Sequence, residues 1–334
     1  MSKHVTILQG DLLQQPAMRV WSQLQPERVE PESIEILKKR RKSTVYRLCG
    51  VGPDGSAVIA KRSWLAQALV ERTIYEEVLP HLPIPALSYY GFAVEEEGEY
   101  GWLFLADAIG EEYSPHIAAH RALAAQWLGL IHTSAVGVAA AARLPDRGPD
   151  YYLECLRSAH DKILRNLTNP ALTADDLTVL KTVVGQCEVV GSHWSQIEQS
   201  CGRLPRTLIH GDFAPKNMRV RNGRAPIALL PFDWGSAGWG SAAPDLVQSG
   251  ISANNCWASA DLAVYCSMVR ESWPYLDMQN LQPLAIFGKM FRSLVCIDRD
   301  ADSLVTEWVE KCMWNMRSYM AEMADAIQAA EEVG

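Results

Sequence analysis

The chain has 334 residues with a net charge of −8, and 48% of them are apolar. This length exceeds what one small core needs, so it predicts one large domain or two packed ones. The acidic balance argues against a nucleic-acid-binding protein, which needs a basic face.

The sequence lacks the patterns that direct a protein into a membrane or a secretory route. No apolar run approaches the roughly 18 residues of a membrane span, and the N-terminal segment has no long apolar core of a signal peptide. Eight scattered cysteines without a C-x-x-C pair indicate neither zinc nor a redox framework. We therefore expect a cytoplasmic protein, monomeric or homodimeric, with no membrane or nucleic-acid partner.

The N-terminal third predicts a helical preamble followed by a β-rich segment. Residues 1–32 form the preamble, which prolines interrupt. Short runs rich in Val, Ile and Tyr then predict strands, and the sequence GPDG at 52–55 predicts a hairpin turn. Apolar spacing over 65–82 predicts a helix that ends before Pro83. The expected strands are 33–37, 44–51, 56–62, 86–94 and 100–106.

Beyond Gly110 the chain predicts helices, interrupted by one β-rich patch. The expected helices are 116–134, 151–167, 174–199, 259–273, 282–296 and 303–330. The expected strands of the patch are 206–209, 218–221 and 227–232. The last helix is expected to pack through one face, formed by Leu304, Trp308, Cys312, Met316 and Met320.

Polar residues follow two apolar strands of this patch. The first strand ends in His210-Gly211-Asp212, with Asn217 five residues after Asp212, and the second ends in Asp233. Carboxylate and amide oxygens are the ligands that Mg²⁺ shares with phosphates. Phosphoryl transfer needs such metal ions together with a base at the acceptor hydroxyl. The pattern H-x-D-x-x-x-x-N followed by a strand and Asp233 resembles the catalytic and metal loops of the kinase superfamily.

The strings HGDFAPKN (210–217) and FDWG (232–235) resemble the aminoglycoside phosphotransferase and choline kinase family. VYRL, IAKR, ERTIYEEVLPHLPIP and FLADAIG are similar to the N-terminal lobe of that family. The resemblance implies an α+β, two-lobed protein-kinase-like fold. A small antiparallel β-sheet lobe with one key helix would precede a larger, mainly helical lobe. The implied parts are the lobes 1–108 and 109–334, the catalytic loop 208–220 and the metal loop 230–240.

The resemblance also implies roles for the C-terminal residues of the site. Asp212 would accept or orient the proton of the acceptor hydroxyl, and His210 would brace its loop. Asn217 and Asp233 would hold Mg²⁺. We expect the oxygens of these residues to converge, with Lys61 facing them.

In the N-terminal lobe, the resemblance implies that Lys61 reaches the α- and β-phosphates of ATP or GTP. Glu71 would pair with Lys61, although Glu76 and Glu77 are alternatives. The backbone of a hinge would meet the adenine edge. The hinge residues are Leu105, Ala106, Asp107 and Ala108.

The sequence departs from the family pattern in its phosphate-covering loop. The string G-x-G-x-x-G at 50–55 lies too close to Lys61 and precedes no helix, so we interpret it as a hairpin. The loop at the expected place, 38–44, has five cations and no glycine. Arg41, Lys42 and Ser43 would contact phosphates there, or the loop is a solvated basic turn or a nucleic-acid or localisation patch.

Three further residues have two interpretations each. Lys216 could stabilise the transferring phosphoryl group or point to solvent. Asp245 could brace the catalytic loop, but we expect it to cap a helix. His132 is expected to be a core histidine.

We expect a kinase of the antibiotic or aminoglycoside type, with kinases of choline, homoserine or sugars as alternatives. A protein kinase is disfavoured because only eleven residues separate Asp233 from Asp245, too few for an activation segment. A silent scaffold is disfavoured by the intact set of site residues. Aromatic and acidic residues of the helical lobe would suit a cationic acceptor. They are Tyr151, Tyr152, Trp239, Trp257, Tyr265, Trp273, Tyr275, Glu154, Asp261, Glu271 and Asp277.

Overall fold

The computed structural model describes residues 5–25, 29–40, 42–222, 227–248 and 258–333. Contacts group the chain into two compact units. The first comprises Met1–Glu112 and Asn217–Ala237, and the second comprises Tyr113–Lys216 and Gly238–Gly334. The hairpin that carries Asp233 thus belongs with the N-terminal part of the chain. The lobe boundary after residue 108 stays a prediction.

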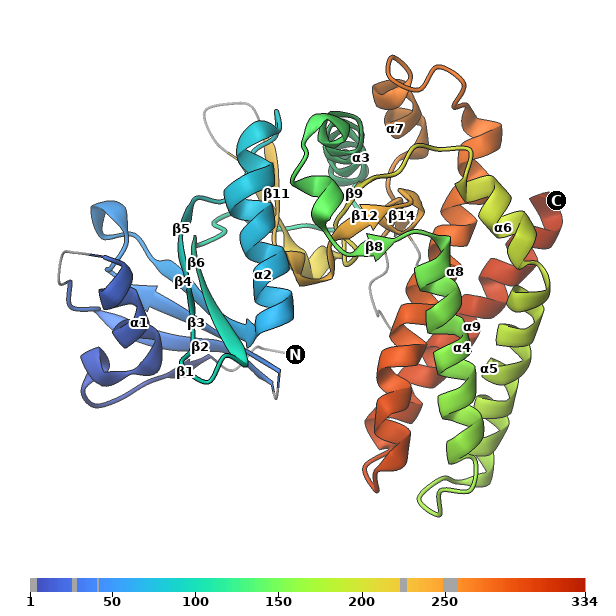
Figure 1. Ribbon diagram of the computed structural model, residues 1–334, viewed down its shortest axis with the longest axis horizontal. Helices are drawn as coiled ribbons and strands as arrows, with labels where there is room; N and C mark the ends of the chain where they lie inside the picture. The colour runs from blue at the N-terminus through green and yellow to red at the C-terminus, as the bar shows by residue number, and fades with distance from the viewer. Residues whose placement is uncertain (1–4, 26–28, 41, 223–226, 249–257, 334) are drawn as a thin grey trace. The chain divides into compact units, whose positions relative to one another are not determined.

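The first unit is built on an antiparallel six-stranded sheet with the strand order β1-β2-β3-β4-β6-β5 (Figure 1). The strands predicted from Val, Ile and Tyr runs are all present in it. The bounds are β1 (Thr6–Ile7), β2 (Ser33–Arg40), β3 (Ser43–Cys49), β4 (Val58–Trp64), β5 (Tyr89–Val94) and β6 (Tyr100–Ala106).

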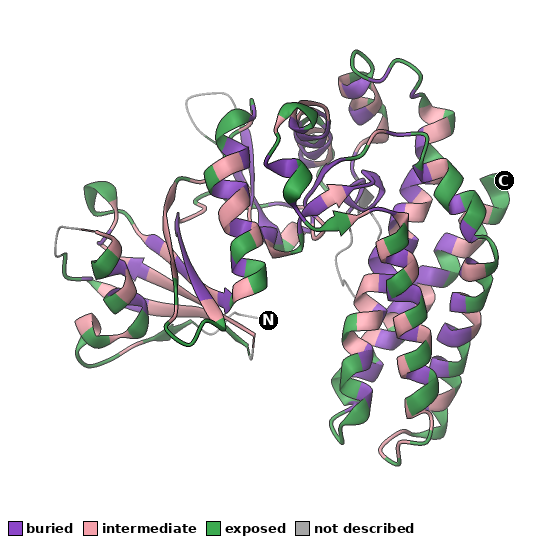
Figure 2. Ribbon diagram, viewed as in Figure 1, coloured by how far each residue is buried: buried purple, intermediate pink, exposed green. Residues whose placement is uncertain are grey.

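A helix covers each face of this sheet (Figure 1). On one face, Met18 and Trp21 of α1 (Pro16–Leu24) pack with Ile34 and Phe104 of the sheet in an apolar core. On the other face lies α2 (Leu65–Thr73), which contacts β4 and β6. Figure 2 shows buried segments of the sheet in purple. The two faces of the sheet therefore pack against different helices.

The predicted helix over 65–82 is present as three consecutive segments. A π-helical turn, Ile74–Val78, and a 3-10 turn, Leu79–His81, continue α2. The predicted preamble is helical only in part. It contains β1, a 3-10 turn (Leu12–Gln14) and α1, because the short stretches between its prolines do not sustain one helix.

A small sheet with the order β11-β10-β7 completes the first unit. Its strands are β7 (Glu111–Glu112), β10 (Met218–Arg221) and β11 (Ala228–Pro231). Met218 pairs with Pro231, so the residues before β10 and after β11 emerge at the same end of the hairpin.

The second unit is mainly helical. Helices α4, α5, α8 and α9 pack along one another, and α3 packs on α7 (Figure 1). The helix bounds are α3 (Ala118–Ser134), α4 (Pro149–Asn166), α5 (Ala174–Ser192), α6 (Trp194–Cys201), α7 (Leu262–Val269), α8 (Met278–Ala301) and α9 (Glu310–Val333). Two small sheets accompany them, formed by β8 (Asp146–Arg147), β9 (Thr207–Ile209), β12 (Gly238–Gly240), β13 (Val247–Gln248) and β14 (Ala258–Ser259).

Two helix predictions are wrong. The single helix expected over 174–199 breaks at His193, where the Ser192 hydroxyl donates to the Val189 carbonyl and the His193 ring lies 2.9 Å from the same oxygen. The last helix begins at Glu310 rather than 303, and Trp308 lies outside it with 84% of its surface exposed. None of the helices in the described part of the chain combines the length and apolar character needed to cross a bilayer.

Candidate active site

A mostly buried lysine connects the sheet to a helix in the first unit. Lys61 of β4 donates through its Nζ to Glu71 Oε1 and to Asp233 Oδ1. Its side chain is 12% exposed and that of Glu71 only 1%. Glu71 lies in the last turn of α2, on the side of the sheet that Lys61 faces. The structure therefore pairs Lys61 with Glu71 rather than with Glu76, which instead pairs with Arg72.

Charges in this cluster depend on each other. Burial alone would lower the pKa of Lys61, but the carboxylates of Asp233 and Glu71 raise it above its usual value. Burial raises the pKa of Glu71, and the Lys61 ammonium opposes that shift. Lys61 is consequently fully charged at neutral pH and is held in a fixed position between two acids.

Asp233 follows β11 in an unusual backbone conformation. Its φ of 68° lies in the left-handed region, which residues other than glycine adopt rarely and at a cost in free energy. A second cation reaches it, because Lys38 Nζ lies 3.7 Å from Asp233 Oδ2. Gly235 follows two residues later, and a Cβ there would lie 3.1 Å from Glu71 Oε1. A glycine at this position gives the Glu71 carboxylate room beside the loop.

Asn217 lies at the same end of the hairpin as Asp233. Its carbonyl accepts a hydrogen bond from Phe232 N at 2.9 Å, and its side chain is almost fully buried. The described residues contain no group of three or more His, Cys, Asp or Glu side chains that could enclose a metal by themselves. One carboxylate with one amide suits Mg²⁺, which takes few protein oxygens and completes its shell with phosphate and water. Asn217 and Asp233 therefore fit a magnesium nucleotide.

In the second unit, Asp212 lies between two cations. Lys216 Nζ is 2.8 Å from its Oδ2, and Arg292 Nη2 is 3.5 Å from its Oδ1. Arg292 comes from α8 and is 8% exposed, whereas Lys216 is 63% exposed. Lys216 thus contacts Asp212 although most of its side chain is exposed, and its role in stabilising the transferring phosphoryl group stays a prediction.

A buried aspartate supports the backbone of the Asp212 loop. The Asp245 carboxylate accepts hydrogen bonds from His210 N at 2.6 Å and Gly211 N at 3.0 Å, and His132 Nε2 lies 3.7 Å away. Burial would raise the pKa of Asp245, but His132 and the His210 backbone lower it below its usual value. The expectation that Asp245 caps a helix is therefore wrong.

Two histidines complete this support. His132 is fully buried and its Nδ1 lies 2.9 Å from the Tyr265 hydroxyl, so it is a core histidine that also reaches Asp245. His210 Nδ1 accepts a hydrogen bond from Asp212 N at 3.3 Å. The His210 ring thus holds the backbone of Asp212, as a bracing role requires.

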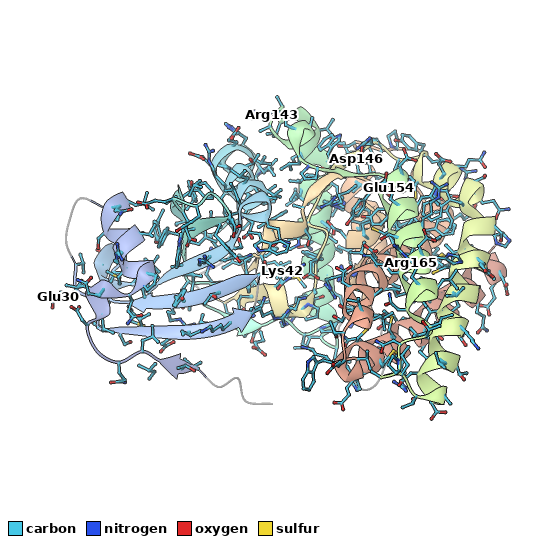
Figure 3. The ribbon with its side chains drawn as sticks, turned by 60° about the horizontal axis from the view of Figure 1, so that its bottom comes forward. Glu30, Lys42, Arg143, Asp146, Glu154 and Arg165 are labelled. Atoms are coloured by element: carbon cyan, nitrogen blue, oxygen red, sulfur yellow. The ribbon has the colours of Figure 1, made fainter. Side chains whose placement is uncertain are left out.

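The turn after β2 is shorter than the loop expected at 38–44. Arg40 pairs with Ser43, so the turn consists of two residues. Arg41 lies outside the described residues. Lys42, labelled in Figure 3, places its Nζ 4.3 Å over the Trp64 ring. Phosphate contacts by Arg41, Lys42 and Ser43 stay predictions.

Of the four residues predicted to form the hinge, Leu105 and Ala106 belong to strand β6, and Asp107 and Ala108 follow it. Leu105 is buried and paired with strands on both sides, and Ala106 N donates to Ser88 O at 2.9 Å. Asp107 follows the strand, and its Oδ2 accepts from Arg47 Nε at 2.8 Å. A contact of the hinge with a nucleotide base stays a prediction, with Asp107 and Ala108 as the segment beyond the strand.

Several residues expected to line the acceptor site have structural roles. Tyr152 and Trp273 are buried in the core of the second unit. Asp261 and Asp277 cap the N-termini of α7 and α8 by accepting hydrogen bonds from backbone amides. Trp257 lies outside the described residues. These positions therefore do not support the choice of a cationic acceptor.

Sequence reasoning missed three residues of this site. Arg292 is 80 positions from Asp212 in a helix with no motif, so no local signal marks it. Lys38 belongs to the basic loop, but its strand position and its contact with Asp233 depend on the register of β2. For Asp245 the sequence pattern predicted the cap of a helix instead of the support of the Asp212 loop. The predicted convergence of Asp212 with Asn217 and Asp233 joins residues of different units and stays a prediction.

Comparison with known proteins finds one matching protein family and many solved structures that are similar to this chain. The model of the phosphotransferase enzyme family matches residues 51–274. A search of curated proteins finds no match. The chain is similar in structure to an aminoglycoside 2′-phosphotransferase-IIIa bound to GDP, with a TM-score of 0.62 and 13% identity, over 93% of this chain and 99% of the other.

Two other solved structures extend the comparison. A spectinomycin phosphotransferase bound to ADP and spectinomycin gives a TM-score of 0.57 at 10% identity, over 91% of this chain and 94% of the other. An ethanolamine kinase from Plasmodium vivax gives 0.53 at 13% identity, over 88% and 82%. At these identities the structures establish the two-lobed kinase-like fold.

Proposed function

This chain belongs to the phosphotransferase enzyme family and is a small-molecule kinase, and we propose that it transfers the γ-phosphoryl group of ATP or GTP to a hydroxyl of an aminoglycoside-like acceptor. The observation that carries the proposal is the hydrogen-bonded cluster of Lys61, Glu71 and Asp233, in which Glu71 is buried. Together with Asn217 and Asp212, it supplies each group that phosphoryl transfer requires.

The nucleotide is bound by residues of the first unit. Lys61, fixed by Glu71, contacts the α- and β-phosphates as a permanent positive charge. Asn217 and Asp233 would hold Mg²⁺, and the bound cation would neutralise phosphate charge. Of the compared structures, the spectinomycin phosphotransferase is bound to ADP and the aminoglycoside 2′-phosphotransferase to GDP, which supports a nucleotide substrate of either base.

The acceptor is activated by Asp212. Its carboxylate orients the acceptor hydroxyl and takes its proton as the phosphoryl group arrives. Lys216 and Arg292 hold the two carboxylate oxygens, so that Asp212 keeps one orientation. Asp245 and His210 fix the backbone on which Asp212 stands. Lys216 also brings a positive charge close to the transferring group.

The choice of acceptor rests on the related structures. Two of them are antibiotic phosphotransferases and one is an ethanolamine kinase, so both classes enter the test. The purified protein is incubated with Mg²⁺ and ATP or GTP and with aminoglycosides, spectinomycin, ethanolamine, choline, homoserine and sugars. Mass spectrometry detects an acceptor heavier by one phosphoryl group.

Two variants decide whether the assigned residues act. Asp212→Asn should lower kcat by about 10²–10⁴-fold while nucleotide binding is kept, because only proton transfer and orientation are lost. Asp175→Asn, an exposed aspartate in the first turn of α5, is the matched control and should behave as wild type. The proposal would be refuted if none of the acceptors in the panel were phosphorylated. It would also be refuted if the Asp212→Asn variant kept full activity.

A further inference from the structure

Strand β2 contains a β-bulge immediately before Lys38. Ile36 pairs with Tyr46, but Lys38 pairs with Val45, so Leu37 is an additional residue opposite β3. Side chains alternate between the two faces of a strand, and one extra residue moves those that follow to the other face. The bulge therefore decides on which side of the sheet Lys38 lies.

The pairing across the sheet identifies that side. Ile36 is aligned with Tyr46, Ala60 and Phe104, which belong to the face that packs against α1. Lys38 is aligned with Val45, which is aligned with Lys61. Lys38 therefore faces the same side as Lys61, whereas without the bulge it would follow Ile36 to the α1 side.

On this side, Lys38 meets the proposed metal-binding aspartate. Its Nζ lies 3.7 Å from Asp233 Oδ2, while Lys61 binds the other oxygen, Oδ1. The side chains of Lys38 and Asp233 are 39% and 30% exposed, so a ligand can reach both. Burial raises the pKa of Glu71, and both Lys61 and Lys38 act to lower it, so the charge of Lys38 is felt within the cluster.

We propose that Lys38 binds the terminal phosphates of the nucleoside triphosphate, an inference that rests on the proposed kinase function. When a magnesium nucleotide binds, Asp233 would contact its cation and lose the contact with Lys38. The Lys38 ammonium would then bind phosphate oxygens of the nucleotide. In protein kinases a glycine-rich loop covers the phosphates. Here the two-residue turn after β2 has no glycine, and one re-aimed lysine supplies a positive charge instead.

A purely local role for Lys38 predicts the opposite result. If Lys38 only neutralised Asp233, it would compete with Mg²⁺ for that carboxylate. Its removal would then strengthen binding of the magnesium nucleotide or leave it unchanged. If Lys38 binds phosphate, its removal weakens binding even when Mg²⁺ is saturating, and weakens it most for the nucleotide with the most phosphates.

The test measures equilibrium binding of fluorescent nucleoside triphosphates and diphosphates, of adenine and guanine, to the full chain at saturating Mg²⁺ without acceptor. Lys38→Met, which keeps the aliphatic stem, should weaken triphosphate binding about tenfold and diphosphate binding less. Lys38→Arg should restore most of the affinity. Lys39→Ala is the matched control, since Lys39 is exposed and its row, with Thr44 and Arg62, lies on the opposite face.

Each outcome has a distinct meaning. Wild-type affinity or tighter binding by Lys38→Met overturns the phosphate role and leaves the proposed function intact. Equal losses in Lys38→Met and Lys39→Ala also overturn it, because they would reflect charge in general. Failure of the wild-type chain to bind any of these nucleotides overturns the proposed function and the role of Lys38 together. Thermal unfolding of each variant shows that the losses arise in a folded protein.

Discussion

The substitution Glu71→Gln distinguishes what the ion pair of Lys61 and Glu71 contributes to catalysis from what it contributes to stability. Glutamine keeps the shape of the side chain and an oxygen for the Lys61 ammonium, but it removes the negative charge. Glu71 is only 1% exposed, so water cannot replace the lost charge. Lys61 retains its contact with Asp233 and stays charged.

The size of the effect follows from the kind of hydrogen bond that changes. A hydrogen bond to a charged group contributes about 1.5–3 kcal/mol and one between neutral partners about 0.5–1.5 kcal/mol. The substitution should remove about 1–2 kcal/mol of the interaction free energy that holds Lys61 in position. This loss should lower kcat/KM for the nucleotide about five- to thirtyfold. The free energy of unfolding should change by less than about 1 kcal/mol. The reason is that Lys61 is not left unpaired, and a carboxylate that burial penalises is removed.

The assay compares steady-state kinetics and urea unfolding of wild type, Glu71→Gln and Glu76→Gln. Glu76 lies one turn further along, in an exposed pair with Arg72, and serves as the matched control. Its variant should retain wild-type kinetics and stability. Unchanged kcat/KM in Glu71→Gln together with a large loss of stability would refute the reasoning, because the pair would then be structural only.

Two further substitutions test the second unit. Asp245→Asn leaves one oxygen for the amides of His210 and Gly211, so it should lower the free energy of unfolding by about 1–3 kcal/mol and reduce kcat more than the KM for nucleotide. Because the folded pKa of Asp245 is depressed, this stabilisation is present above the unfolded pKa of about 3.9 and is lost as pH falls through the folded value. Urea unfolding at pH 7 and in acid should therefore show a smaller difference in acid, and an equal difference at both would contradict the assignment. Glu322 of α9 is buried beside Arg292, Lys289 and Asp325, and burial raises its pKa to about 7. Its stabilisation is complete below the unfolded pKa of about 4.3 and is lost as pH rises to about 7, so Glu322→Gln should gain stability relative to wild type over that range, and parallel pH profiles would contradict it.

The sequence predicted those parts of the fold that depend on local pattern. Strands β6 and β10 have the expected bounds. Strand β6 is a short apolar run between turn signals, and in β10 buried apolar residues alternate with arginines. The break at His193 was missed because it depends on side-chain hydrogen bonds to one carbonyl, which apolar periodicity does not report. Trp308 was misplaced because a helical spacing continues through residues that the chain uses for a turn.

The site was predictable where a motif carries it and hidden where register or distance carries it. Asp212, Asn217 and Asp233 follow strands in a recognisable order, and Lys61 lies on a strand before a helix that bears Glu71. Lys38 was hidden because one bulged residue changes its face, which a sequence pattern of alternation cannot reveal. Arg292 was hidden because contacts between residues far apart in sequence arise only from packing.

The path of the chain between the two units limits how such a protein can be divided or recombined. It passes from one unit to the other after residues 112, 216 and 237, and the second passage separates Lys216 from Asn217. A gene fragment ending at residue 112 would encode Lys61 and Glu71 but neither Asn217 nor Asp233. Exchange of whole units between relatives therefore needs three coordinated junctions. A single crossover after residue 112 or 216 would produce a chimera whose Asn217 and Asp233 come from a different parent than its Lys61.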